Sequence, residues 1–119
     1  MPPRSVLLAL LGLAACAAAP RLSRADVAGT TWREVCPSPE IATAYVRLEP
    51  SGLMAWSYAD PGSVRVDTVH TWAVEDGALW LRWNGGSART RYRAGRYPGR
   101  LTGEGSTFCL DGPWLERVE

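Results

Sequence analysis

The chain has 119 residues, with thirteen Lys plus Arg against twelve Asp plus Glu and a formal net charge of +1. This length leaves room for one small domain, and the balanced charge gives no general attraction to nucleic acid or to an acidic membrane surface. Six Trp and four Tyr, with twelve Gly and nine Pro available for turns, favour strands joined by tight turns and argue against disorder.

The first fifteen residues have the pattern of a secretory signal peptide. Arg4 precedes a short apolar run over residues 6–15, which is too short to span a bilayer. The run ends in Leu13-Ala14-Ala15-Cys16 and resembles the lipobox of bacterial lipoproteins, in which the cysteine is diacylated on sulfur and becomes the new N-terminus. Residues 1–15 are therefore predicted to be a signal peptide, and Cys16 a lipidation site.

The resemblance to lipoproteins implies a place in the cell. The protein would be anchored in the cell envelope by its lipid, and Ala17 at the second mature position implies the outer membrane, facing the periplasm. Residues 16–27 would then be the lipidated N-terminus and a tether. Cleavage after Ala17, Ala18 or Ala19 is the alternative, and it would leave a soluble periplasmic protein.

Two cysteines remain when Cys16 carries lipid, namely Cys36 and Cys109. Exported proteins meet an oxidising compartment, so this pair is predicted to form a disulfide. The bond would close a loop of roughly seventy residues and contribute about 4 kcal/mol by restricting the unfolded chain. One His and no Cys-x-x-Cys spacing argue against a metal site, and no cofactor is predicted.

Residues 28–119 are predicted to form one all-β domain. Turn signals recur about every eight to twelve residues, which is typical of a meander of about eight short strands. The turns are Pro50-Ser51-Gly52, Asp60-Pro61-Gly62, Asp76-Gly77, Gly85-Gly86, Pro98-Gly99, residues 103–105 and Asp111-Gly112-Pro113.

Two of these turns predict the strand register. An Asp76-Gly77 turn pairs Glu75 with Ala78, and a Gly85-Gly86 turn pairs Asn84 with Ser87. Side chains alternate between the two faces of a strand, so the register predicts which share the inner face. They are Val64, Val66, Thr68, His70, Trp72, Val74, Leu79, Leu81, Trp83, Ala88, Thr90 and Tyr92.

A sheet with one apolar face can cover that face by closing on itself. The first strand, residues 30–35, and the last strand, residues 114–118, would then meet near Cys36 and Cys109, where the disulfide would fasten the seam. The predicted fold is therefore a small closed or nearly closed up-and-down barrel. Met54, Trp56 and Tyr58 share a face of the third strand and are expected to belong mostly to its core.

This arrangement resembles the lipocalin-like (calycin) barrels. Gly29-Thr30-Thr31-Trp32 lies at the first strand and Arg117 on the last. The resemblance implies that Trp32 packs at the barrel floor against Arg117, in a cation–π contact. The spacing is Gly-x-x-Trp rather than the family's Gly-x-Trp, and the domain is shorter than an ordinary lipocalin.

A second likeness is to the small periplasmic inhibitors of bacterial metalloproteases, which are also compact eight-stranded barrels with one disulfide. Residues 72–88 look similar to theirs, with a Trp, an Asp-Gly turn, alternating Leu and Gly-Ser-Ala. Cys109 falls in a different part of the chain from the corresponding cysteine.

His70 is the single histidine, and its predicted inward position makes it a candidate for lining a binding cup. The other candidate lining residues are Trp72, Trp83 and Tyr92. The simpler interpretation is a core histidine that bonds a hydroxyl such as Thr68 or Thr90, or water. Asp67 is expected on the opposite face, so no acid–base or nucleophile arrangement is predicted and the protein is not expected to be an enzyme.

The outer face of the same strands is rich in arginine. Trp80, Arg82, Arg89, Arg91 and Arg93 form a candidate docking face for an anionic partner, or an ordinary solvated sheet surface. The sequence thus favours a non-enzymatic envelope lipoprotein that binds a small apolar or amphipathic ligand, or a partner protein, at the barrel mouth. The alternative is a periplasmic inhibitor of a protease or lysozyme, acting through its tether or a loop.

Overall fold

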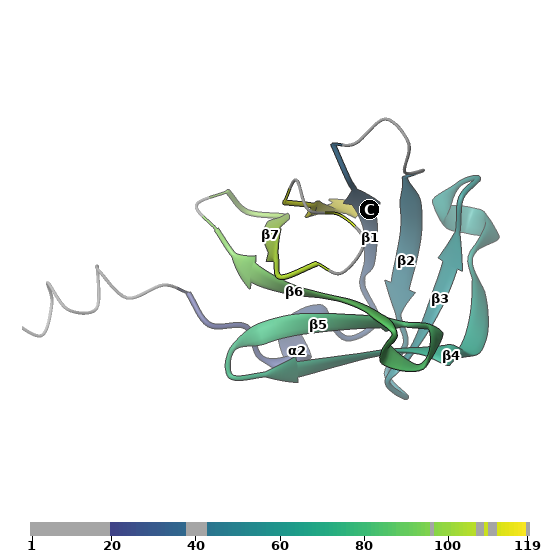
Figure 1. Ribbon diagram of the computed structural model, residues 1–119, viewed down its shortest axis with the longest axis horizontal. Coiled ribbons are helices and arrows are strands. Elements are labelled where there is room, and N and C mark those ends of the chain that lie inside the picture. Colours follow the sequence, from purple (N-terminus) through teal and green to yellow (C-terminus); the bar gives the residue numbers. More distant parts are fainter. Residues whose placement is uncertain (1–19, 38–42, 96, 107–108, 110–111, 119) are drawn as a thin grey trace, which may run out of the picture.

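The computed structural model describes residues 20–37, 43–95, 97–106, 109 and 112–118. It is an all-β protein in which eight antiparallel strands form a closed up-and-down barrel (Figure 1). The strands are β1 (Thr31–Val35), β2 (Ala44–Leu48), β3 (Leu53–Ser57), β4 (Arg65–Glu75), β5 (Ala78–Trp83), β6 (Ala88–Ala94), β7 (Arg100–Glu104) and β8 (Trp114–Val118). The short helices are α2 (Arg24–Val27), η1 (Pro61–Ser63) and η2 (Asn84–Gly86). The predicted fold class is confirmed.

The seam of the barrel lies where the sequence predicts it. β1 pairs with β8, from Thr31 opposite Val118 to Val35 opposite Trp114. Cys36 follows β1 directly and forms a disulfide with Cys109, with 6.0 Å between the two Cα atoms. The predicted disulfide is confirmed, and it joins the strands at one end of the seam.

Both predicted hairpin registers are confirmed. Glu75 pairs with Ala78 across a turn in which Asp76 and Gly77 have positive φ angles of 52° and 74°. Such angles favour glycine and define the turn type whose twist matches the flanking strands. Trp83 pairs with Ala88, which is the next pair in the register that places Asn84 opposite Ser87.

The first half of β4 departs from the predicted inner face. Leu53 pairs with Thr71 and the adjacent Met54 with Asp67, so residues 68–70 are extra on β4. A bulge of this kind changes which face the following residues point to. His70 and Trp72 are buried as predicted, but Val66 is 48 % exposed and Thr68 is exposed.

The barrel has two different ends, which we name the floor and the mouth. The β2–β3, β4–β5 and β6–β7 connections lie at the floor, whereas the connections β1–β2, β3–β4, β5–β6 and β7–β8 lie at the mouth. The N-terminal segment enters at the floor (Figure 1). The disulfide lies at the mouth.

Part of the predicted tether belongs to the fold. The backbone N–H of Leu22 donates to the carbonyl of Gly77, 2.9 Å away, and Val27 of α2 is only 1 % exposed. Val27 belongs to the core cluster and Leu22 packs against it, so both apolar side chains help to cover the floor. The ordered domain therefore starts before residue 28.

Candidate functional site

The interior of the barrel is packed by its own side chains. Among the described residues, eleven buried ones form one cluster, and the partly buried Trp56, Val74 and Trp83 pack against it. Trp72 and Tyr92, two of the predicted lining residues, are 2 % and 0 % exposed and lie within this cluster. A barrel of this size is expected to be filled by side chains, and these two residues serve the core.

A buried acid that was not among the predicted site residues lies inside the barrel. Glu34 is 6 % exposed and accepts a hydrogen bond from the hydroxyl of Tyr92. Burial penalises the charged carboxylate and raises the pKa of Glu34 to about 7, although the Tyr92 hydrogen bond opposes the shift. Burial, and then the charge of Glu34, raise the pKa of Tyr92. Glu34 is therefore protonated in weakly acidic solution.

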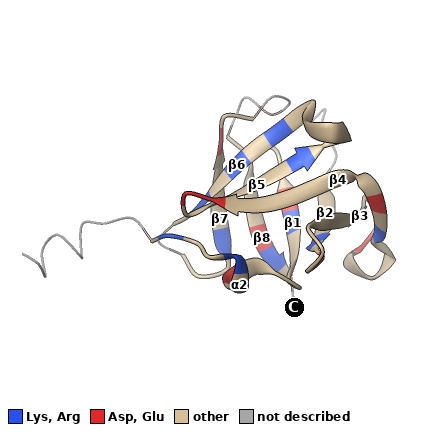
Figure 2. Cartoon of the chain, turned by 90° about the horizontal axis from the view of Figure 1, so that it is seen from below, with Lys and Arg blue, Asp and Glu red and all other residues tan. Residues whose placement is uncertain are grey.

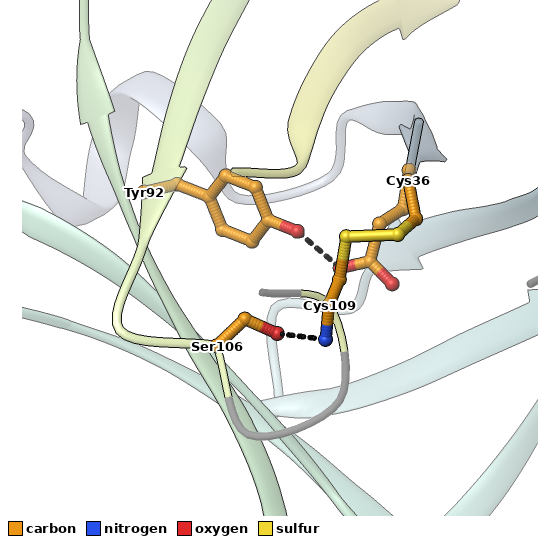
Figure 3. The surroundings of a disulfide bond; sticks show 5 residues. Cys36, Tyr92, Ser106 and Cys109 are labelled. Atoms are coloured by element: carbon orange, nitrogen blue, oxygen red, sulfur yellow. Dashed lines mark hydrogen bonds between the residues drawn. A yellow bond between two sulfur atoms is a disulfide. The ribbon is translucent and has the colours of Figure 1, made fainter. Parts of the chain in front are cut away.

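The signal for Glu34 was present in the strand alternation. Trp32 is inward, so the residue two positions later faces inward as well. Tyr92 fits across the barrel because Gly103 is opposite it on β7, where a Cβ would lie 2.9 Å from the tyrosine ring. Figure 3 shows the Tyr92 hydroxyl pointing towards the disulfide, and the Cys109 N–H donating to Ser106 Oγ at 2.9 Å. The hydrogen-bonded pair of Glu34 and Tyr92 thus lies at the mouth end of the seam.

Four aromatic rings meet edge to face at the mouth, and we name them the mouth cluster. The ring centroids of Trp56 and Tyr58 are 4.8 Å apart, those of Trp56 and Trp83 6.0 Å, and those of His70 and Trp83 4.9 Å. Tyr58 was expected in the core but is 63 % exposed, because it follows the end of β3. The mouth cluster therefore extends from the buried His70, through the partly buried Trp56 and Trp83, to the exposed Tyr58.

His70 is fixed within the mouth cluster by two contacts. Its Nδ1 accepts the backbone N–H of Asn84 at 3.0 Å, so the neutral ring carries its proton on Nε2. Nε2 lies 3.6 Å from Oδ2 of Asp67. The prediction that Asp67 faces away was wrong, because the bulge returns it to the side of Met54. The partners are a backbone amide and a carboxylate, not the expected hydroxyls.

The arrangement of His70 and Asp67 is better suited to holding the imidazole ring in place than to proton transfer. A separation of 3.6 Å exceeds a hydrogen bond, and His70 is 5 % exposed. Beside it, Nε1 of Trp83 is buried with no hydrogen-bond partner among the described residues. His70 and Trp83 therefore form the buried side of the mouth cluster, and Trp56 links them to the exposed Tyr58.

The predicted floor pair lies side by side, since Trp32 and Arg117 are register partners. The Trp32 indole N–H donates to Thr30 Oγ1 at 2.6 Å. The guanidinium that lies over a floor tryptophan belongs to Arg24, which is 4.4 Å from the centre of the Trp72 ring. Arg24 also donates to the Pro50 carbonyl at 2.5 Å, so α2 is fastened over the floor.

The predicted docking face lies on the outside of β5 and β6, where Trp80 pairs with Arg91 and Arg82 with Arg89. In Figure 2 the basic residues appear as blue segments along β5 and β6. The guanidinium groups of Arg82 and Arg91 lie 5.6 and 5.9 Å from the Trp80 ring.

Neighbouring carboxylates compensate much of the charge on this face. Arg82 pairs with Glu75 at 3.0 Å, and Arg91 and Arg93 each pair with Glu104 at 2.6 Å. Arg93 and Arg91 lower the pKa of Glu104, mainly through the Arg93 hydrogen bond. The face is therefore a network of ion pairs rather than a set of free cations.

No family model, curated protein or solved structure matches the chain. The likeness to lipocalins therefore stays a prediction. The predicted lipidation site, Cys16, and the predicted signal peptide, residues 1–15, lie outside the described residues. Within the described part of the chain, no helix has the length and apolar character that crossing a bilayer requires.

Proposed function

We propose that this protein is a non-enzymatic binding module of the bacterial cell envelope. A lipid on Cys16 holds it on the outer membrane, and its mouth cluster binds a partner protein that presents apolar side chains. The observation that carries the proposal is the distribution of exposed apolar side chains. Of the four large ones described, Tyr58, Val66 and Val69 lie close together in the chain, on β4 or just after β3, and the fourth, Tyr97, lies on the β6–β7 connection.

The packed interior favours a partner protein over a small ligand inside the barrel. Exposed tyrosine beside half-buried tryptophan is the composition that dominates protein interfaces, because large rings bury much area at little cost in side-chain entropy. The Tyr58 ring rests on Trp56 and is already partly oriented for contact. Native mass spectrometry of the protein from its own envelope should show only the acylated chain; a bound small molecule would favour the ligand-carrier alternative instead.

The fold also supports an orientation on the membrane. The chain leaves the barrel at the floor, where Leu22 is bonded to Gly77. A lipid on Cys16 would therefore hold the floor towards the bilayer and direct the mouth away from it, into the periplasm.

We expect a Cys16→Ser variant to leave the membrane fraction and to lack the mass of the acyl chains. Each buried methylene contributes about 0.8 kcal/mol, so the acyl chains account for nearly all membrane affinity. Fractionation and intact mass of the two proteins check this. Continued membrane association of the variant would contradict the lipobox prediction.

The partner is sought with a photoreactive phenylalanine analogue at Val69, incorporated in living cells. We expect one main cross-linked protein, and the additional change Tyr58→Ser should lower its yield at least ~10-fold, because central tyrosines dominate interface energy. The control carries the analogue at Tyr97, which is 70 % exposed and lies at the floor, next to an open pocket. Equal yields at Val69 and Tyr97, or no effect of Tyr58→Ser, would overturn the proposal.

The alternative function, inhibition of a periplasmic protease or lysozyme, is favoured by the ordering of residues 22–27 against the barrel. Because residues 22–27 are held against the floor, the residues before them would be presented to an enzyme's cleft from a fixed point, which lowers the entropy lost on binding. Purified protein would be titrated against lysozymes and metalloproteases. Tight inhibition that is lost on removal of residues 17–21, at an unchanged melting temperature, would favour this alternative over the mouth cluster.

A further inference from the structure

One strand of the closed barrel has an open edge. β4 has eleven residues and β5 has six, and β5 pairs with β4 only from Thr71 to Glu75. On its other side, β4 pairs with β3 from Arg65 to Asp67. Residues 65–69 are all exposed, and in Figure 1 this part of β4 forms the right-hand border of the molecule. Such an edge can pair with another strand.

The charges along this edge match a second copy of the same edge. Arg65 and Asp67 lie on one face of the strand, and Val66 between them lies on the other. When two antiparallel copies meet about a two-fold axis at Val66, Arg65 of each lies opposite Asp67 of the other. A strand edge protected by like charges would repel its own copy, whereas this sequence attracts it.

The side chains of the edge are available for these contacts. No acidic group among the described residues forms an ion pair with Arg65. Asp67 is 47 % exposed at its side chain; one oxygen accepts the Val69 N–H at 3.2 Å and the other lies near His70. A carboxylate has capacity for further hydrogen bonds, so it can also accept from an arginine.

We propose that two copies of this protein associate through residues 65–67 of β4, paired antiparallel about Val66. The interface contains two Arg65–Asp67 pairs on one face, a Val66–Val66 contact on the other, and backbone hydrogen bonds between the edges. The bulge at residues 68–70 ends the regular edge, so the paired segment is short and the dimer dissociates readily. This dimer uses the strand edge rather than the mouth rings; it shares the exposed Val66 with the apolar surface proposed for the partner, but it does not rest on that proposal.

Charge reversal tests the pairing in the full chain by sedimentation equilibrium over a range of concentrations. Arg65→Glu places carboxylates opposite each other at both ends of the pair, and Asp67→Arg places two guanidinium groups there. Each single change should weaken dimerisation at least ~10-fold, because two attractive pairs become repulsive. The double variant Arg65→Glu/Asp67→Arg restores opposite charges and should dimerise again. A monomeric wild type, or a double variant as weak as the single ones, would overturn the proposal.

A cysteine at the two-fold axis gives a second measurement. Directly opposed residues in an antiparallel pair have Cα atoms about 4.5 to 5.5 Å apart, within the range of a disulfide. Mild oxidation of Val66→Cys should therefore give a covalent dimer in high yield. Thr102→Cys, on the exposed face of β7, is the matched control and should stay monomeric. Equal cross-linking of the two variants would show random collision and contradict the two-fold pairing, whatever the mouth cluster binds.

Discussion

Replacing both Cys36 and Cys109 with alanine is expected to destabilise the protein by about 4 kcal/mol, because the bond closes a loop with a sequence separation of 73. For a domain of this size, that loss corresponds to a fall in melting temperature of roughly 20 °C. Small domains have a total stability of about 5 to 15 kcal/mol, so the variant would be close to unfolding at growth temperature. Thermal unfolding followed by circular dichroism measures the difference.

The location of the bond adds to the effect. Cys36 directly follows β1 and Glu34 lies two residues before it, so the disulfide holds the mouth end of the seam over a buried acid. The control is Cys16→Ser, which should leave the melting temperature unchanged. A double alanine variant within about 3 °C of the native protein would mean that the bond does not stabilise the fold.

Stability is expected to fall as the pH rises from about 4.5 to 7, because Glu34 is buried. Its pKa is about 7 in the folded protein, against an ordinary value of 4.5. The folded state therefore keeps a proton that the unfolded state has lost in this interval, and raising the pH favours unfolding. A shift of this size corresponds to about 3 kcal/mol, fully present as stability below pH 4.5 and lost above pH 7.

Glu34→Gln isolates this contribution. The amide has nearly the same shape, can still accept from the Tyr92 hydroxyl and does not ionise. We expect the variant to be more stable than the native protein above pH 7 and to lose the slope between pH 4.5 and 7. Urea unfolding of both proteins at pH 5, 6, 7 and 8 provides the comparison. Parallel pH profiles would show that Glu34 does not titrate in this range.

The pairing of Cys36 with Cys109 could be predicted because it depends on a count of thiols and on the compartment, not on packing. The hairpin at Asp76 and Gly77 could also be predicted without knowledge of the packing. A two-residue turn needs positive φ at both positions, so the turn residues alone set the register of β4 against β5. Local rules of this kind hold wherever the rest of the chain does not oppose them.

The site at the mouth depended on contacts that no local rule gives. The bulge at residues 68–70 turned Asp67 towards His70 and exposed Val66, because a few extra residues in one strand change the face of everything before them. Tyr58 followed the end of its strand into solvent instead of the core. Glu34 followed the alternation of β1, but its partner Tyr92 lies 58 residues away and is placed only when the barrel closes.

By itself, the sequence determined the all-β class, the order of the strands, two hairpin registers and the disulfide, since each follows from residue types close together in the chain or from a count. Only the tertiary structure decided how the barrel is filled, which rings remain exposed and which strand keeps an open edge. These features depend on the relative lengths and offsets of neighbouring strands, and on side chains brought together from distant parts of the chain. Closure of the barrel fixes the strand offsets and the contacts between distant side chains at the same time.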